Sequence, residues 1–467
     1  MALIKSISGI RGTIGGETGE NLTPIDIVKF TIAYSRLLSE LYPEKRLTMV
    51  IGRDARISGR MVNNLVEGTL LGCGVDVINV GMCTTPGVEV AVKHYGADGG
   101  VIITASHNPR EWNALKLLNA EGEFINAEQG ARLLTLSEQG DFSFPTINSI
   151  GKVVKRNKEF NSKHIEKVLA LPMVNLLAVQ ERGFKVVVDA VNSIGGVVIP
   201  ELLRQMGCQV IEINCEPTGE FAHNPEPLAE NLTEISEVIR LYGADLGVVV
   251  DPDVDRLALV CEDGEMFGEE YTLVAVADYI LGQLHSGNTV SNLSSSRALR
   301  DVTLAHGGSY SASAVGEVNV VEMMKATGAV IGGEGNGGVI YPESHYGRDS
   351  LVGVALFLTY FATKNIKMSE LKASFPQYFA SKNKIQLTPE IDVDNILTTI
   401  KSRYEEEEIN DIDGVKIDFD ESWVHLRKSN TEPIIRIYTE AKSQDEADSL
   451  AEKFIEELTE ISKMSAK

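Results

Sequence analysis

Short apolar runs rich in β-branched residues alternate with helix-like patterns over the first three-quarters of the chain. These runs predict strands at 47–52, 75–80, 99–104, 184–191, 208–214, 244–250, 288–293 and 328–333. Ser58 is expected to cap the helix between the first two runs, and Gly72 or Gly74 can end it. One face of that helix is predicted to carry Met61, Val62, Leu65 and Thr69. Strands separated by helices indicate parallel, doubly wound α/β sheets.

The last part of the chain has a different pattern. From about residue 380 it predicts a strand, a helix, three strands (415–420, 423–428 and 434–440) and a terminal helix after Asp445. The acidic run at 405–408 is placed in the first of these helices, as a solvated face. This order of elements is typical of an antiparallel α+β lobe.

The pattern therefore predicts an α/β protein with three doubly wound lobes and one C-terminal α+β lobe. We expect the lobes to occupy 1–155, 156–260, 261–375 and 376–467. No low-complexity linker separates them, which favours tight packing around shared clefts. In open parallel sheets, ligands bind beyond the carboxyl ends of the strands, so the loops that follow strands are the first places to search for chemistry.

Charge narrows the classes of partner. The 467 residues contain 66 acidic and 43 basic side chains, which gives a formal net charge of -23. A chain that acidic repels nucleic acid and anionic membranes, so neither is expected as a partner. An anionic small molecule would need a locally basic site.

The cysteines and the apolar stretches indicate a cytoplasmic protein. The five cysteines are odd in number and show no C-x-x-C spacing, which is typical of reduced thiols. The N-terminus has no apolar run long enough for a signal peptide. The most apolar stretch, 351–362, is too short to span a membrane and is predicted to be a buried helix.

The segment TASHNP at 104–109 directly follows a predicted strand. Asn108 and Pro109 disfavour a helical continuation, so this segment is expected to be a loop that presents Ser106. A hydrolytic pair with His107 is disfavoured, because adjacent residues rarely face each other and no G-x-S-x-G elbow surrounds the serine. A serine without a partner base can instead carry a phosphate, and an ordinary polar turn is the alternative.

The segment DPDVDR at 251–256 follows another strand and places carboxylates at alternate positions. Asp251, Asp253 and Asp255 would repel one another without a cation, and hard oxygen ligands suit Mg²⁺ or Ca²⁺. An EF-hand is disfavoured because Arg256 stands where its turn requires glycine and both flanks read as strands. A phosphatase with an aspartyl nucleophile explains two of the aspartates and leaves the serine loop unused. A purely structural acidic turn is the remaining alternative.

Two further loops carry polar groups suited to a sugar phosphate. GGEGNGG at 332–338 allows close backbone approach and offers Glu334 and Asn336 to sugar hydroxyls. RKSNTEP at 427–433 lies between two predicted strands, with Arg436 three residues further on, and its guanidinium, hydroxyls and amide suit a phosphate. Each loop alone is a weak signal, since glycine-rich turns and charged hairpins are common.

Together the four loops, in this order, resemble those of the α-D-phosphohexomutase superfamily. That superfamily includes phosphoglucomutase, phosphomannomutase and phosphoglucosamine mutase. The opening segment SGIRGT at 8–13 is also similar to its N-terminal signature. The resemblance extends from Gly9 to Arg436 and implies four domains around a central cleft.

The resemblance also implies roles for individual residues. Ser106 corresponds to the phosphorylated serine, and Mg²⁺ is expected to be bound by Asp251, Asp253, Asp255 and an oxygen on Ser106. The other candidate catalytic residues are Arg11, His107, Lys116 and Arg256, with Lys116 in proton transfer and the arginines near the transferring phosphoryl group. The candidate substrate-binding residues are Glu334, Asn336, Arg427, Ser429, Asn430, Thr431 and Arg436.

The preferred sugar is harder to predict. Asn336 and Gly338 stand where many members have serine and histidine, and this form resembles phosphoglucosamine mutase. Asn430, however, is more like phosphomannomutase or phosphoglucomutase. We expect interconversion of glucosamine 6-phosphate and 1-phosphate, with mannose or glucose phosphates as the alternative. A glucosamine or glucose 1,6-bisphosphate is the expected activator, and the enzyme is expected to be a monomer or homodimer.

The alternative outside this class is a calcium- or sugar-phosphate-binding protein without catalysis. The mutase hypothesis makes one geometric demand: the hydroxyl of Ser106 must lie within reach of the same metal ion as the three aspartates.

Overall fold

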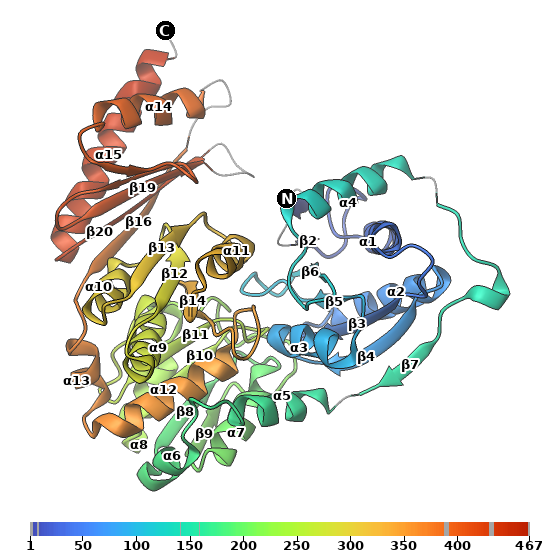
Figure 1. Cartoon of the computed structure of the whole chain (residues 1–467), viewed down its shortest axis with the longest axis horizontal. Coiled ribbons are helices and arrows are strands. Elements are labelled where there is room, and N and C mark those ends of the chain that lie inside the picture. Colours follow the sequence, from blue (N-terminus) through green and yellow to red (C-terminus); the bar gives the residue numbers. More distant parts are fainter. Residues whose placement is uncertain are drawn as a thin grey trace. The chain divides into compact units, whose positions relative to one another are not determined.

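The computed structural model describes residues 3–6, 9–140, 142–157, 159–386, 392–428 and 434–465, and the chain forms two compact units. The first unit comprises residues 1–280 and 336–372, and the second comprises 281–335 and 373–467. The first unit is therefore discontinuous in sequence, because the chain leaves it for the second and later returns (Figure 1).

The first unit begins with a mixed sheet in the order β1-β2-β6-β5-β3-β4-β7. Its strands are β1 (Ile4–Ser6), β2 (Gly9–Thr13), β3 (Thr48–Arg53), β4 (Asp76–Met82), β5 (Gly99–Ile103), β6 (Trp112–Leu118) and β7 (Val153–Arg156). The expected parallel pairing holds for β5, β3, β4 and β7. It does not hold for β6, which returns directly from the serine loop and pairs antiparallel with both β5 and β2. A short connection can join only antiparallel neighbours.

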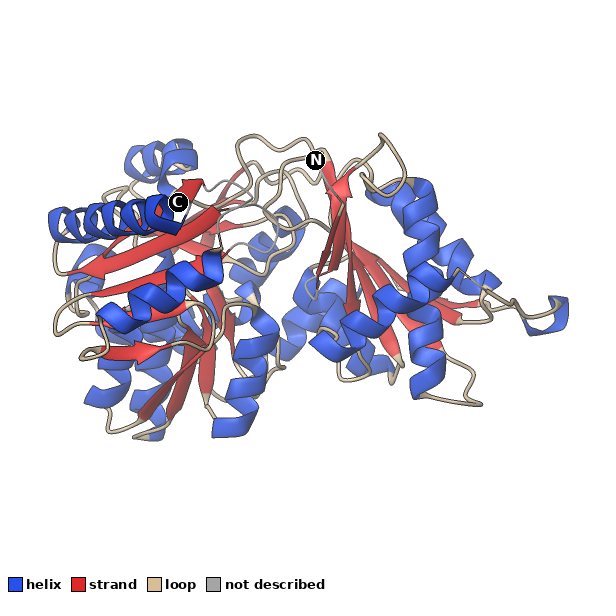
Figure 2. Ribbon diagram, turned by 90° about the horizontal axis from the view of Figure 1, so that it is seen from above, coloured by secondary structure: helices blue, strands red, loops and turns tan. Residues whose placement is uncertain are grey.

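Helices cover both faces of this sheet, as Figure 2 shows. They are α1 (Pro24–Leu41), α2 (Gly59–Gly72), α3 (Thr85–Tyr95) and α4 (Ala127–Gln139). Met49 and Ile51 of β3 belong to a core shared with α1, α2 and α4, whereas Val50 belongs to a second core shared with α3. Because side chains alternate along a strand, one strand serves two cores. The predicted doubly wound arrangement is confirmed.

The sequence prediction for α2 is right in position and wrong in two details. Ser58 has helical backbone angles, and its hydroxyl accepts a hydrogen bond from the Asn113 amide instead of one from the helix. The core face of α2 carries Val62, Val66 and Leu70, whereas Met61 is exposed. The predicted set combined the core face of the helix with an adjacent face, because successive positions such as 61 and 62 lie only about 100° apart around a helix.

A second sheet of the first unit has the order β11-β10-β8-β9. Its strands are β8 (Lys185–Asp189), β9 (Gln209–Ile213), β10 (Leu246–Val250) and β11 (Leu257–Cys261). The helices of this region are α5 (Phe160–Leu169), α6 (Leu176–Arg182), α7 (Gly195–Gln205) and α8 (Thr233–Tyr242), with short 3-10 turns at Ile147–Ser149 and Ala229–Asn231. Helix α7 contacts β8 and β9, and α8 contacts β8 and β10. The predicted parallel order holds except at β11, which pairs antiparallel with β10.

The apolar stretch at 351–362 forms most of α12 (Ser350–Lys364), which follows β15 (Gly338–Ile340). Helix α12 is buried from Ser350 to Phe361 and contacts α5 and α6, so the prediction of a buried helix is confirmed. Among the residues that the structure describes, there is no helix with the length and apolar character needed to cross a membrane. Helices α9 (Glu269–Leu284) and α13 (Met368–Ala373) lie where the chain passes between the units.

The second unit contains an α/β part and an antiparallel part. In the α/β part, α10 (Arg297–Ala305) and α11 (Glu317–Thr327) pack on the parallel strands β12 (Asn288–Asn292), β13 (Ser309–Ser313) and β14 (Ile331–Glu334). The antiparallel sheet has the order β16-β20-β19-β18-β17. Its elements are β16 (Phe379–Gln386), α14 (Val393–Arg403), β17 (Glu408–Asn410), β18 (Val415–Asp418), β19 (Trp423–Lys428), β20 (Ile434–Ala441) and α15 (Gln444–Ser465).

Helices α14 and α15 share one core with this last sheet, so the predicted α+β lobe is confirmed. The placement of 405–408 in its first helix is wrong, because α14 ends at Arg403 with Tyr404 as its C-cap. Four acidic side chains at the negative end of a helix dipole disfavour its continuation. They are exposed, as expected, and Glu408 begins β17.

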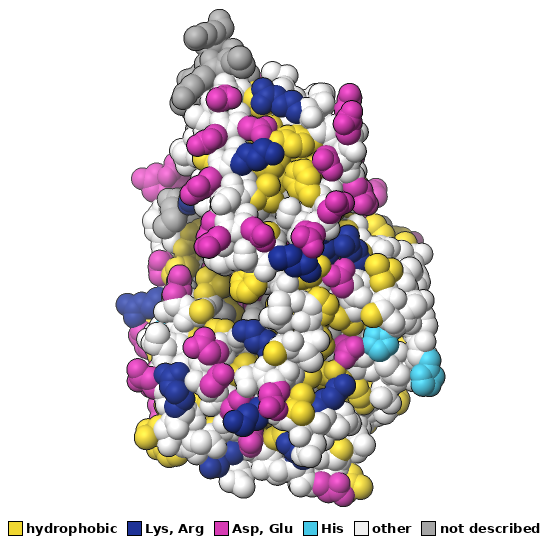
Figure 3. All heavy atoms as spheres, turned by 90° about the vertical axis from the view of Figure 1, so that its left-hand side faces the viewer, with side chains coloured by type: hydrophobic (Ala, Val, Ile, Leu, Met, Phe, Trp, Pro, Cys, Tyr) yellow, Lys and Arg dark blue, Asp and Glu magenta, His cyan; other side chains and the backbone are white. Residues whose placement is uncertain are grey.

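The face drawn in Figure 3 shows how the net charge is distributed there. Asp and Glu side chains lie scattered among Lys and Arg instead of forming one patch. The acidic excess of the chain is therefore spread over this face, which has no continuous basic stripe.

Candidate active site

Ser106 lies in the loop that joins β5 to β6. Its backbone has a φ of 49°, in the left-handed region that residues other than glycine rarely adopt. The Ser106 N–H donates to Thr104 Oγ1 at 3.0 Å, and the Thr104 hydroxyl donates to Asp54 at 2.7 Å. The sequence therefore builds a strained loop and supports it with side chains from the adjacent strand end.

Arg56 is the main support of this loop. Its guanidinium is fully buried and pairs with Asp54 at 3.0 Å. Its remaining nitrogens donate to four backbone carbonyls of the loop and the start of β6: Ser106, Asn108, Pro109 and Trp112. One planar cation thus fixes the path of the chain on both sides of Ser106.

Arg56→Met is expected to lower the free energy of unfolding by about 3–5 kcal/mol, because Asp54 would remain buried without its cation. Turnover should also fall, because the serine loop would lose the four bonds that hold its conformation. Urea unfolding and an activity assay on the full chain measure the two effects. Arg60→Met, on the exposed face of α2, is the matched control. Equal stability of the two variants would contradict the role given to Arg56.

The aspartate loop follows β10, and its three carboxylates are fully buried. Ser106 Oγ donates to Asp251 Oδ2 at 2.8 Å, although 145 positions separate the two residues. The backbone N–H groups of Asp255 and Arg256 donate to Asp251 Oδ1 at 3.2 Å each. The structure thus brings together the serine and the three alternating aspartates, as the mutase hypothesis demands.

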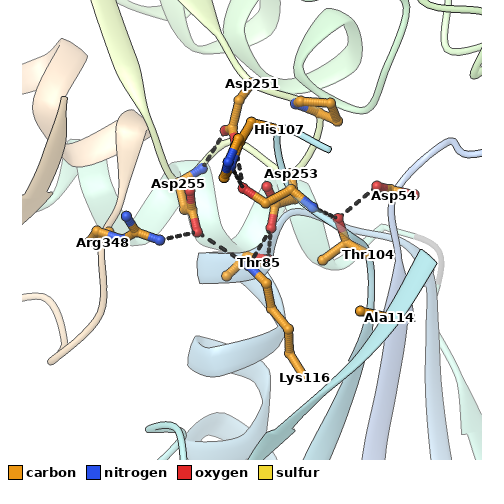
Figure 4. A network of polar contacts seen from close by, with 12 residues as sticks. Asp54, Thr85, Thr104, His107, Ala114, Lys116, Asp251, Asp253, Asp255 and Arg348 are labelled. Carbon is orange, nitrogen blue, oxygen red and sulfur yellow. Dashed lines mark hydrogen bonds and ion pairs between the residues drawn. The ribbon is translucent and has the colours of Figure 1, made fainter. Parts of the chain in front are cut away.

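Three side chains neutralise or bind these carboxylates, as Figure 4 shows. Lys116 Nζ lies 2.8 Å from Asp253 Oδ2 and 3.3 Å from Asp255 Oδ2. The Thr85 hydroxyl, at the start of α3, donates to Asp253 Oδ2 at 2.6 Å. Arg348 donates to Asp255 Oδ2 at 2.8 Å. Lys116 and Arg348 therefore form ion pairs with two of the three buried carboxylates.

The charges of this cluster alter its protonation. Burial lowers the pKa of Lys116, but Asp253 and Asp255 outweigh burial and raise that pKa above the usual range. Burial raises the pKa of Asp253, but the Lys116 ammonium outweighs burial and lowers that pKa below the usual range. Burial, followed by repulsion from Asp253 and Asp255, raises the pKa of Asp251 well above its ordinary value. Without a further cation, the three carboxyls therefore do not all ionise readily.

A divalent cation fits this cluster. Oxygen atoms of Asp251, Asp253 and Asp255 lie within 4.8 Å of one another. Within the described part of the chain, Asp253 Oδ1 and Asp255 Oδ1 are buried and accept no hydrogen bond. Buried carboxylate oxygens without donors are costly unless a cation binds them, and an all-oxygen set suits Mg²⁺.

Basic side chains gather around His107. Burial, together with the nearby guanidinium groups of Arg256, Arg11 and Arg348, lowers the pKa of His107 to about 2 against the opposing charge of Asp255. His107 Nδ1 is 3.4 Å from Ser106 Oγ, whose shorter bond goes to Asp251. Such a weakly basic imidazole is a poor acceptor for the serine proton, which disfavours a Ser–His hydrolytic pair. The site is locally basic within an acidic chain, as an anionic substrate requires.

The chain matches models of one protein family over most of its length. The models are described as phosphoglucomutase/phosphomannomutase, alpha/beta/alpha domains I, II and III, and the C-terminal domain. They match residues 3–143, 162–264, 268–379 and 364–457. The chain belongs to the phosphoglucomutase/phosphomannomutase family.

Relatives in this family match along nearly the whole chain. A phosphoglucomutase/phosphomannomutase of Thermococcus kodakarensis is 38% identical over 93% of this chain and 95% of its own. A phosphoglucosamine/phosphogalactosamine mutase of Sulfurisphaera tokodaii is 32% identical over 96% of this chain and 98% of its own. A phosphoglucomutase/phosphomannomutase family protein of Burkholderia thailandensis has the same fold, with a TM-score of 0.83, 24% identity, and 97% and 98% of the two chains covered.

The glycine-rich loop at 332–338 contains two candidate substrate-binding residues, Glu334 and Asn336. Glu334, at the end of β14 in the second unit, is buried and accepts from the Asn292 amide at 2.9 Å and the Gly316 N–H at 3.2 Å. Asn336, in the first unit, accepts from Arg348 at 3.4 Å. The Glu334 carboxylate and the side-chain carbonyl of Asn336 are thus each hydrogen-bonded to residues of their own unit.

In the last loop the structure describes only the flanking residues. Arg427, on β19, donates to Asp413 at 2.7 Å, and Asp413 also accepts from the Val315 N–H at 3.0 Å. Arg436 is exposed on β20, opposite Arg427 in register. The predicted phosphate-binding residues Ser429, Asn430 and Thr431 lie outside the described residues.

Sequence reasoning missed three groups of this site: Arg56, Thr85 and Arg348. Arg56 and its partner Asp54 follow β3 directly, so charged residues at a strand end were a usable signal. Thr85 and Arg348 meet aspartates 168 and 93 positions away, respectively, and no local pattern marks such pairs.

Proposed function

We propose that this protein is a phosphohexomutase that interconverts hexose 6-phosphates and hexose 1-phosphates through phosphorylated Ser106 and a bisphosphorylated sugar. The contact between Ser106 Oγ and Asp251, within a buried aspartate cluster that fits Mg²⁺, is the observation that supports this proposal most directly. A serine at a metal site can pass a phosphoryl group without a general base of the hydrolytic type.

In the proposed reaction, the bond between phosphorus and Ser106 Oγ breaks as a bond forms from phosphorus to a sugar hydroxyl. The sugar then turns end for end, and its other phosphoryl group returns to Ser106. Arg11 and Arg256 stabilise the oxygens of the transferring group, and His107 contributes a neutral imidazole beside them. Bound Mg²⁺, held by Asp251, Asp253 and Asp255 with an oxygen on Ser106, would neutralise the charge of that group.

Lys116 is our candidate for moving the proton of the reacting hydroxyl. Its ammonium group lies at Asp253 and Asp255, so it is placed beside the transfer and is protonated while these carboxylates face it. As the ammonium it can give its proton to the Ser106 oxygen when the phosphoryl group leaves, and the resulting amine can then take the proton that the attacking sugar hydroxyl releases.

The remaining predicted residues bind the substrate in this proposal. Glu334 and Asn336 bind sugar hydroxyls, while Arg427 and Arg436 bind the phosphate that does not react, together with Ser429, Asn430 and Thr431. The lobe boundaries at 155, 260 and 375 and the central cleft belong to the same proposal. So do a hexose 1,6-bisphosphate activator, a cytoplasmic location and a monomeric or homodimeric state. The five cysteines, all within the described residues, are free, which supports a reducing compartment.

We propose glucosamine phosphates as the preferred substrates. The GEGNGG loop and the relative from Sulfurisphaera tokodaii, a phosphoglucosamine/phosphogalactosamine mutase, support this choice. The second candidate is activity on mannose and glucose phosphates, which the 38% identical relative from Thermococcus kodakarensis supports.

A side-by-side assay of glucosamine, mannose and glucose 1- and 6-phosphates tests the function. Mg²⁺ and a trace of the matching 1,6-bisphosphate are included. Isomerisation without release of inorganic phosphate is expected, together with about one phosphate on Ser106 by intact mass. Continuous phosphate release would identify a phosphatase, and the absence of both isomerisation and phosphoserine would leave a binding protein.

A further inference from the structure

A buried cluster of two carboxylates and two imidazoles lies next to the aspartate site, and the proposed reaction does not use it. We define this His345 cluster as Glu89, His164, His345 and Asp349. Their side chains are at most 7% exposed. They come from α3, from α5 and from the loop before α12, and α5 contacts both α3 and α12.

His345 stands between the two carboxylates. Its Nδ1 lies 3.2 Å from Glu89 Oε2 and its Nε2 lies 3.1 Å from Asp349 Oδ2. A neutral imidazole carries one N–H and can donate to only one carboxylate, whereas an imidazolium places a positive charge within 3.2 Å of both. His164 Nε2 lies 2.8 Å from the same oxygen of Asp349.

Each carboxylate of the cluster belongs to an element that supports a predicted metal ligand. Glu89 lies on α3 one turn after Thr85, whose hydroxyl and backbone N–H bind Asp253. Asp349 directly follows Arg348, which binds Asp255, and its other oxygen caps α12 at Leu351 and Val352. The cluster therefore joins the support of Asp253 to the support of Asp255.

The backbone of the loop is also fitted closely to Glu89. A Cβ atom added at Gly347 would lie 1.9 Å from Glu89 Oε2, so a larger residue here would displace the Glu89 carboxylate. On the other side, Lys167 of α5 donates to the Ser344 carbonyl at 2.7 Å. The residues on both sides of His345 are thus anchored to helices of the first unit.

We propose that His345 is a positioning residue, whose imidazolium links Glu89 and Asp349 and thereby holds Thr85 and Arg348 against the metal-binding aspartates. The expected effect of His345 on turnover rests on the proposed function. Its expected effect on Mg²⁺ affinity requires only that the three aspartates bind the ion. Supports behind metal ligands commonly change metal affinity or activity by about 10–100-fold when they are removed.

His345→Gln in the full chain tests the proposal. The amide can replace one hydrogen bond but not the charge, so Glu89 and Asp349 would lose the positive charge of His345. We expect the Kd for Mg²⁺, measured by calorimetry, to rise about tenfold, with a similar fall in turnover. The exposed His285→Gln is the matched control. An unchanged Kd and an unchanged turnover in His345→Gln would overturn the proposal.

A second variant separates positioning from a general loss of structure. His345→Gln with Glu89→Gln removes the Glu89 charge that faced the imidazolium, so the double variant is expected to recover at least about threefold of the lost Mg²⁺ affinity. If His345→Gln fails to fold, Glu89→Gln alone retains a hydrogen-bonding side chain and should still raise the Kd for Mg²⁺. No recovery in the double variant and no change in Glu89→Gln would contradict the link.

The pH dependence gives a further readout. Burial lowers the pKa of His345, but hydrogen bonds to Asp349 and Glu89 outweigh burial and raise it to about 9. The facing groups are Glu89, Asp349, His164 and, beyond Ser344, Lys167. The stabilisation from the imidazolium is therefore complete below the ordinary histidine pKa of 6.5 and is lost as pH rises through about 9.

The difference in Mg²⁺ affinity between wild type and His345→Gln should accordingly shrink above pH 9. A constant difference from pH 7 to 10 would contradict an imidazolium link. A Co²⁺ absorption band that requires His164 and His345 would also overturn it, because protonated nitrogens cannot bind a metal. Absence of mutase activity in wild type, with normal Mg²⁺ binding, would instead refute the proposed function and leave the positioning role testable.

Discussion

Ser106→Ala is expected to reduce mutase turnover by about a hundredfold or more, because the variant has no oxygen to carry the phosphoryl group. The fold should remain intact. The serine loop is held through backbone carbonyls by Arg56 and through a backbone N–H by Thr104, and neither contact uses the Ser106 hydroxyl. Turnover is measured with the preferred sugar phosphate, and intact mass should show the loss of the bound phosphate.

Ser39→Ala, in α1 and outside the site, is the control for this experiment. It should keep both turnover and the phosphate. Full turnover of Ser106→Ala would reject the serine as the carrier. A phosphate that remains on the variant would show that another residue is modified.

Asp253→Asn is expected to produce the second large effect. The substitution removes one charged ligand while keeping the side-chain shape, so the Mg²⁺ concentration for half-maximal activity should rise about a hundredfold and turnover should fall. The effect should exceed that of His345→Gln, because Asp253 is itself a proposed ligand. Titration of activity with MgCl₂ after removal of metal by EDTA measures it.

Asp263→Asn is the matched control, because Asp263 is exposed in the turn after β11. Its metal dependence should equal that of wild type. If Asp253→Asn also required no more Mg²⁺ than wild type, the aspartate loop would not be the metal site.

The central strands and both central loops were predictable because their signals are local. Buried strands such as 246–250 read as apolar runs, and the loops that follow them carry the polar residues. That Ser106 and the three aspartates share one site was implied only by the resemblance to the phosphohexomutases, because β5 and β10 belong to different sheets. The structure adds the distance of 2.8 Å.

The features of the fold and of the site that were not predictable depend on contacts between residues that are far apart in the sequence. Nothing around Arg348 indicates that its guanidinium binds Asp255, and nothing around His345 indicates two carboxylate partners from different elements. The antiparallel return of β6 was missed because a fully buried strand, with no alternation of polar and apolar residues, does not indicate its direction. The end of α14 was missed because helical periodicity does not reflect the repulsion among four successive glutamates.

The discontinuity of the first unit has a consequence for biosynthesis. A ribosome delivers Ser106 and the aspartate loop well before residues 336–372, which complete the same unit. Until that segment emerges, the nascent chain holds three clustered aspartates without the guanidinium of Arg348 and without Asp349 at the start of α12. Completion of the support around the three aspartates is therefore a late event in translation, because Arg348 follows residues 281–335 of the second unit in the chain.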